Sequence, residues 1–284
     1  MKRILCIFFG KEGTSSLDYF LGKINTIYKP RYEPIDLCHY DKIEYNELNN
    51  NMIEYMKFLF NIKNNIEKIN LSRLKSLKNI SLEQYNKIVS KYNYIYYKAR
   101  YNHDMYKLEQ LKLDYIILPI RYDFEFILSL YIKRNYKDLQ KSLSQFNRSK
   151  INIKDEKKLY QKRKLNKENF IYELTTIFDR YINLFKTRYN FLKKNNYNIF
   201  IYNYNEFKEN NILVLNKLLK FLDIPNENIS YDTYYKKKIF SYSIIFDNDD
   251  NKIIKELKKK YFDEKYNNFD KFIKSIQNNN GIEK

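Results

Sequence analysis

Three short apolar runs predict buried strands. They are residues 3–9 (R-I-L-C-I-F-F), residues 114–120 (D-Y-I-I-L-P-I) and residues 198–202 (N-I-F-I-Y). Continuous apolar runs of this length, without polar alternation, are typical of strands that are buried on both faces of a parallel sheet.

Helical spacing of apolar residues separates these runs. Leu17, Phe20, Leu21 and Ile24 indicate a helix after the first run, and the same spacing recurs from Phe124 after the second run. Further helices are predicted at about 167–195, 206–222 and 251–276. Alternating strands and helices predict an α/β fold with a central parallel sheet, whose ligands bind at the carboxyl ends of the strands.

Composition predicts the structure of the remaining segments. Residues 28–40 contain Pro30 and Pro34 and predict an irregular loop, whereas residues 41–112 lack glycine and proline and predict a helical insertion. Residues 141–166 hold nine basic and two acidic side chains, a net charge of +7, and predict a basic, mobile surface segment. We expect a single domain over residues 1–284.

Composition narrows the class of protein. Cys6 and Cys38, with two histidines in the whole chain, provide neither a disulfide framework nor a convincing zinc site. Because no apolar run approaches the roughly 18 residues of a membrane helix, a soluble, cytoplasmic protein is expected. The net charge of +19 is compatible with a polyanionic partner, but the abundance of Lys, Asn, Ile and Tyr also fits an A/T-rich coding sequence.

A glycine loop follows the first predicted strand. Three of the four glycines in the chain lie within the first 22 residues, and the loop reads G-K-E-G-T-S-S from Gly10 to Ser16. Backbone N–H groups and hydroxyls at a helix start can hold a phosphate, and Lys11 adds a positive charge. The alternative is an ordinary turn with a Ser/Thr helix cap. The Walker A spacing is absent because Lys11 precedes Gly13, which disfavours an ATPase or GTPase.

Arg121 follows the second predicted strand, and Ser129 lies two helical turns later. Both side chains could reach one anion near the sheet edge. The chain has only ten arginines, so an arginine at this position is more informative than a lysine. The alternative is an ordinary surface arginine.

Together these segments resemble sulfotransferases that use 3′-phosphoadenosine-5′-phosphosulfate (PAPS). K-x-G-T-[ST] resembles the family's 5′-phosphosulfate loop, and the arginine with a serine eight residues later resembles its 3′-phosphate motif. Residues 204–209 (Y-N-E-F-K-E) and 218–225 (L-L-K-F-L-D-I-P) resemble the family's Y-E-D-L and F-L-G-[IL]-P segments. The resemblance implies a P-loop-like, three-layer α/β fold.

The resemblance also implies roles for individual residues. Lys11 would be catalytic and, with Gly13, Thr14, Ser15 and Ser16, would hold the 5′-phosphosulfate. Arg121 and Ser129 would hold the 3′-phosphate, and Tyr204 would contact adenine. Glu33, within a Y-E-P segment similar to that of carbohydrate sulfotransferases, is the first choice for the catalytic base, and His39 is the second. No metal is implied.

Two departures from the family pattern refine the expectation. Asp123 stands where the family's second motif has proline, although Glu125 keeps the acidic position. No glycine lies between Gly22 and Gly281, so the C-terminal G-x-x-G-x-x-[KR] loop of small-molecule members cannot exist. This absence favours the carbohydrate-sulfating and bacterial branches of the family, whose acceptor would be a glycan or glycolipid. In these branches a basic loop, such as residues 236–238 here, would provide further contacts to the 3′-phosphate.

Two other classes of function remain open. One is another nucleotide-dependent transferase or kinase, although no Walker lysine is in register. The other is a basic, non-enzymatic binder of nucleic acid or polyanionic glycan, for which the charge and the 30 tyrosines are the evidence.

Overall fold

The computed structural model describes residues 1–8, 14–29, 82–99, 105–135, 167–225 and 248–279, with single positions 53, 56, 57, 59, 60 and 246. The chain divides into two compact units. The first comprises Met1–Ile120 and Thr187–Tyr231, and the second comprises Arg121–Lys186 and Asp232–Lys284.

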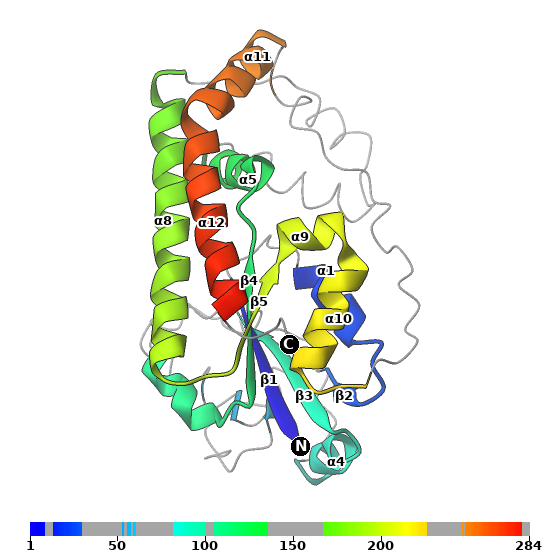
Figure 1. Ribbon diagram of the computed structural model, residues 1–284. Coiled ribbons are helices and arrows are strands. Elements are labelled where there is room, and N and C mark those ends of the chain that lie inside the picture. Colours follow the sequence, from blue (N-terminus) through cyan, green and yellow to red (C-terminus); the bar gives the residue numbers. More distant parts are fainter. Residues whose placement is uncertain are drawn as a thin grey trace. The chain divides into compact units, whose positions relative to one another are not determined.

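The first unit contains a sheet with, among the described residues, five parallel strands in the order β2-β3-β1-β4-β5. The strands are β1 (Lys2–Ile7), β2 (Ile27–Tyr28), β3 (Tyr94–Ala99), β4 (Tyr115–Ile120) and β5 (Ile199–Asn203). They point in one direction in Figure 1. β1, β4 and β5 are the three strands that the apolar runs predict, and the α/β class with a central parallel sheet is confirmed.

β3 corrects the prediction of a wholly helical insertion over residues 41–112. The helix α4 (Leu82–Val89) and the 3₁₀ helix η3 (Met105–Leu111) lie in this range, but Tyr94–Ala99 form a strand that pairs with β1. Tyrosine and isoleucine fit a pleated, buried surface well, and this preference outweighs the absence of glycine and proline punctuation. Most of residues 30–81 and all of 141–166 lie outside the described residues.

The sheet core is apolar. Ile4, Leu5, Cys6 and Ile7 of β1 are fully buried, as the continuous apolar run requires for a central strand. Burial of a large aliphatic side chain contributes about 1.5–3 kcal/mol. β1 is therefore held by side-chain burial as well as by hydrogen bonds to both of its neighbours.

The order of the strands defines a topological switch point. β1 and β4 are hydrogen-bonded neighbours. After β1 the chain continues through α1 (Thr14–Leu21) to β2 at one edge of the sheet, whereas after β4 it continues to β5 at the other edge. Open parallel sheets bind ligands outside the carboxyl ends of two such strands, because the two connections lead away from each other.

The predicted helix at 206–222 is two helices. α9 (Tyr204–Glu209) follows β5 directly, and α10 (Asn211–Phe221) begins after Asn210, whose side chain accepts a hydrogen bond from the Leu213 N–H. Asparagine is a strong N-cap residue, so Asn210 starts a new helix. The predicted end of this segment is confirmed, because Asp223 adopts a positive φ of 59° directly after it.

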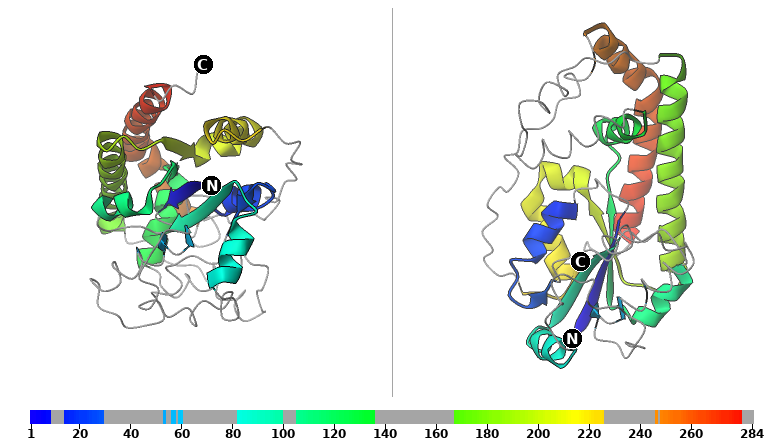
Figure 2. Two further views of the ribbon diagram at one scale, coloured as in Figure 1. Left: turned by 90° about the horizontal axis from the view of Figure 1, so that it is seen from below. Right: turned by 180° about the vertical axis from the view of Figure 1, so that it is seen from behind.

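The second unit contains α5 (Phe124–Asn135), α11 (Asn248–Leu257), the π-helical turn η5 (Lys258–Phe262), α12 (Asp263–Asn279) and the first part of α8 (Lys167–Lys194). Figures 1 and 2 show α8 and α12 side by side. Aromatic rings hold them together: Phe269 of α12 lies 6.0 Å from Phe185 and 6.3 Å from Phe178 of α8 between ring centroids. Among the described residues, no helix combines the length and apolar character that crossing a membrane requires.

Candidate functional site

The helix α1 begins just beyond the carboxyl end of β1. Its first residue, Thr14, is 5% exposed, and Ser16 is 4% exposed. The Ser16 Oγ is buried, and no described residue provides it with a hydrogen-bond partner. A buried hydroxyl without a partner costs free energy, so its presence in the first turn of a helix indicates a position where an incoming acceptor or donor would be favoured. Lys11, Gly13, Glu33, His39 and the side chain of Ser15 lie outside the described residues.

Arg121 is the first residue after β4, as predicted. Its side chain already has a partner: the guanidinium Nε donates to Asp123 Oδ2 at 2.8 Å, and Nη2 donates to Asp123 Oδ1 at 3.1 Å. The backbone N–H of Arg121 donates to the Tyr181 hydroxyl at 3.1 Å. The guanidinium also lies 5.7 Å from the centroid of the Phe126 ring. The arginine is thus held in place by groups of its own unit.

Ser129 lies in α5, but its hydroxyl is used locally. It donates to the backbone carbonyl of Phe126 at 2.7 Å, and the residue is 8% exposed. This is the common back-bond of a serine within a helix. To bind an anion together with Arg121, the Ser129 hydroxyl would first have to rotate away from the Phe126 carbonyl.

Tyr204 follows β5, the neighbour of β4. Its half-buried ring stacks on Phe207, with 5.9 Å between centroids and 20° between planes. Asn203 caps α9 by accepting from the Asn205 N–H and donating to Glu206. The side chain of Tyr204 is therefore placed by a capped helix start at the carboxyl edge of the sheet, where a planar base could stack on it.

A half-buried charged cluster, which the sequence did not reveal, joins α1 to β3. Asp18 of α1 forms an ion pair with Lys98 of β3, accepts the Tyr96 hydroxyl at 2.7 Å and lies 3.8 Å from Lys29. Burial raises the pKa of the Tyr96 phenol well above its ordinary value, and Cys6 and Asp18 add to the effect. The cluster attaches α1 to β3 and holds a lysine near the carboxyl end of that strand. Because Lys98 and Asp18 are 80 residues apart in sequence, only the fold brings them together.

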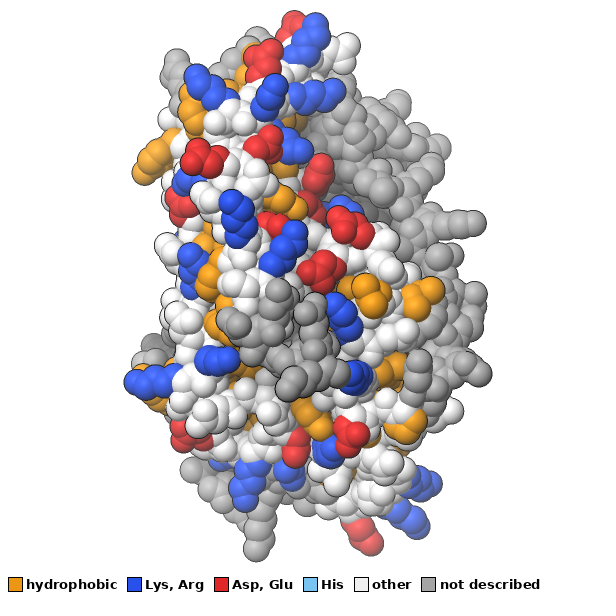
Figure 3. All heavy atoms as spheres, viewed as in Figure 1, with side chains coloured by type: hydrophobic (Ala, Val, Ile, Leu, Met, Phe, Trp, Pro, Cys, Tyr) orange, Lys and Arg blue, Asp and Glu red, His pale blue; other side chains and the backbone are white. Residues whose placement is uncertain are grey.

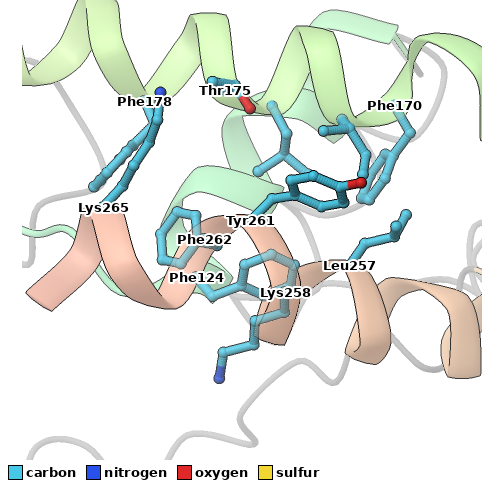
Figure 4. Close-up of a pocket in the computed structure, with 11 residues that line it drawn as sticks. Phe124, Phe170, Thr175, Phe178, Leu257, Lys258, Tyr261, Phe262 and Lys265 are labelled. Atoms are coloured by element: carbon cyan, nitrogen blue, oxygen red, sulfur yellow. The ribbon is translucent and has the colours of Figure 1, made fainter.

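A hollow lies within the second unit, between α8 and the segment η5–α12 (Figure 4). Its walls include Phe124, Phe178 and Phe262, with the Thr175 hydroxyl as a polar group. Lys258 also lines it, and its Nζ lies 5.7 Å from the centroid of the Phe124 ring. Arg121, Ser129 and Tyr204 are not among the residues that line this hollow.

Charges on the surface are mixed in sign. On the face drawn in Figure 3, lysine and acidic side chains of the described residues alternate and do not gather into one basic patch.

No protein-family model, curated protein or solved structure matches the chain. Among the described residues, no group of His, Cys, Asp or Glu could hold a metal ion.

Proposed function

We propose that the chain is a PAPS-dependent sulfotransferase with a P-loop-like nucleotide site. The observation that carries the proposal is topological. The glycine loop follows β1, Arg121 follows β4, and these two neighbouring strands form the switch point of a parallel sheet. The motifs that resemble the family's phosphate-binding segments thus follow the two strands at which such a sheet binds ligands.

The proposed roles follow from charge and position. Lys11 and the N–H groups and hydroxyls of Gly13, Thr14, Ser15 and Ser16 would bind the 5′-phosphosulfate, and the buried Ser16 hydroxyl supports this part. Arg121 and Ser129 would bind the 3′-phosphate, and Tyr204 would stack against adenine.

The reaction would transfer a sulfuryl group to a hydroxyl of the acceptor, a glycan or glycolipid. The acceptor oxygen attacks sulfur, the bond from sulfur to the bridging phosphate oxygen breaks, and adenosine 3′,5′-bisphosphate leaves. Glu33, or else His39, would take the proton of the acceptor hydroxyl. Lys11 would neutralise the charge that develops on the leaving phosphate. As in phosphoryl transfer, positioning and electrostatic stabilisation supply most of the rate enhancement.

A pair of isomeric nucleotides tests the proposal. Adenosine 3′,5′-bisphosphate should raise the melting temperature of the purified chain more than adenosine 2′,5′-bisphosphate, because a ligand that binds the native state stabilises it by mass action. The two isomers have the same composition and charge, so attraction to a chain of net charge +19 cannot separate them. ATP with Mg²⁺ should stabilise less than the 3′,5′ isomer. Equal stabilisation by both isomers would contradict a 3′-phosphate site and favour a non-specific polyanion binder.

A further inference from the structure

One carboxylate performs two functions at the start of α5. Asp123 accepts two hydrogen bonds from the Arg121 guanidinium, and its Oδ1 also accepts the Phe126 N–H at 2.8 Å. The second contact is an N-cap, because Phe126 is the third residue of α5. Asp123 therefore pairs with the arginine and caps the helix at the same time.

The ion pair is sheltered from solvent. The side chains of Arg121 and Asp123 are 21% and 13% exposed. A bidentate pair between guanidinium and carboxylate is among the stronger hydrogen-bonded pairs in proteins, and partial burial strengthens it because water screens the charges less. Two of the five N–H donors of the arginine are thus directed at Asp123.

The geometry of the carboxylate matches that of a phosphate. A phosphate group also accepts two parallel hydrogen bonds from guanidinium. An anion that uses the same two donors must therefore displace Asp123. When such an anion leaves, the carboxylate is still positioned by the Phe126 N–H and can pair with the arginine again.

We propose that Asp123 is an internal competitor for the anion site of Arg121, which weakens 3′-phosphate binding and speeds its release. The inference rests on the proposed function, because it takes the 3′-phosphate of adenosine 3′,5′-bisphosphate as the anion. If Asp123 competes with the ligand, its removal should tighten binding of the bisphosphate. If Asp123 instead positions Arg121 for the ligand, its removal should weaken binding.

The test uses Asp123→Asn with Glu125→Gln as its matched control. Asparagine caps a helix as well as aspartate does but cannot neutralise guanidinium, so the start of α5 is retained. Glu125 is an exposed acidic residue in the first turn of the same helix, so Glu125→Gln removes the same charge nearby without touching the ion pair. Asp123→Ser, which also retains a capping oxygen, is a second variant in case Asp123→Asn folds poorly.

The full-length chain and its variants are titrated with adenosine 3′,5′-bisphosphate and with adenosine 5′-monophosphate by calorimetry, and dissociation rates are measured by stopped flow. We expect Asp123→Asn to tighten binding of the bisphosphate by about fivefold or more, a modest share of a charge-assisted hydrogen bond, and to slow its release. Asp123→Asn should change binding of the monophosphate, which lacks the 3′-phosphate, by less than about twofold. Glu125→Gln should leave the affinities for both nucleotides within about twofold of the wild type, as expected for a screened surface charge.

Three results would overturn the inference, and they are distinguishable. Weaker binding by Asp123→Asn would show that Asp123 positions Arg121 and does not compete with the ligand. Equal tightening by Asp123→Asn and Glu125→Gln would show a general effect of charge. If the wild-type chain does not prefer the 3′,5′ isomer over the 2′,5′ isomer, the proposed function fails and the inference fails with it. In the first two cases the proposed function stands.

Discussion

At the scale of single residues, Arg121 is the most informative side chain. It follows β4 directly, and a carboxylate, a tyrosine hydroxyl and an aromatic ring hold it in place. These contacts fix the conformation of the side chain, whereas an arginine exposed on the surface samples many conformations. Because replacement of Arg121 also removes a sheltered ion pair, the free energy of unfolding is measured beside the affinity.

Arg121→Ala should weaken binding of adenosine 3′,5′-bisphosphate by about 1.5–3 kcal/mol, the range for a hydrogen bond to a charged group. Arg134→Ala is the matched control, since Arg134 lies exposed in α5, the helix that follows Arg121. Calorimetric titration measures both variants. Equal dissociation constants for Arg121→Ala and the wild type would show that Arg121 does not bind the nucleotide.

The identity of the base is tested by turnover. Glu33→Gln should keep the nucleotide affinity and lower the rate of sulfation of a true acceptor about 10²-fold or more, as loss of a general base implies. The acceptor is first found by incubating the wild-type chain with labelled PAPS and a panel of glycans. Full activity of Glu33→Gln beside an inactive His39→Ala would assign the base role to His39.

At the scale of elements, the cluster around Asp18 attaches α1 to the sheet. The ion pair with Lys98 is sheltered, with side chains 15% and 10% exposed. The pair between Lys2 and Asp223 contains the same residue types, but Asp223 is 83% exposed. The two pairs therefore separate the effect of burial from that of charge.

Asp18→Asn should lower the free energy of unfolding by about 2–3 kcal/mol, because it leaves the half-buried Lys98 ammonium without the carboxylate of Asp18. Asp223→Asn should cost less than about 1 kcal/mol, the usual value for an exposed pair, and asparagine tolerates the positive φ at this position. Urea denaturation measures both. Similar losses in the two variants would show that α1 is held mainly by its apolar face.

Three of the five described strands are predictable from the sequence. β1, β4 and β5 were predictable because each is a short apolar run, and Arg121 was placed correctly because it follows one of them. β3 was not predictable, since its tyrosines and Lys98 resemble one face of an amphipathic helix, and Asp18, which pairs with the half-buried Lys98, is distant in sequence.

The pairing of Arg121 with Asp123 was also missed. Asp123 was read only as a departure from a proline motif, although an aspartate directly before a helix is a recognisable N-cap signal. Asn210, which divides the predicted 206–222 helix, carries the same kind of signal. Ion pairs and rotamers, in contrast to caps, depend on side-chain geometry that local patterns do not encode.

At the scale of the whole molecule, the net charge of +19 attracts any nucleotide. Specific recognition must therefore be separated from this general attraction. Added salt screens the general part, with a Debye length of about 10 Å at 0.1 M ionic strength.

The ratio of the dissociation constants for the 3′,5′ and 2′,5′ isomers should stay constant as salt rises from about 0.05 to 0.3 M, even though both affinities fall. The isomers carry equal charge, so screening of the general attraction affects them alike, whereas a sheltered contact with one phosphate is screened much less. Fluorescence competition with a labelled nucleotide measures the ratio. A ratio that approaches one at high salt would contradict a specific 3′-phosphate site.

The central position of β1 has a consequence for synthesis on the ribosome. Lys2 pairs with Tyr94, and Ile4 pairs with Tyr115, so β1 finds its neighbours only after about a hundred further residues have been synthesised. At about 5–20 residues per second, this takes on the order of 5–20 s. For that time the strand exposes two unpaired edges and an apolar segment from Ile4 to Phe8. Nascent chains of this protein should therefore depend on chaperones until β3 and β4 have emerged from the ribosome, and then collapse around β1.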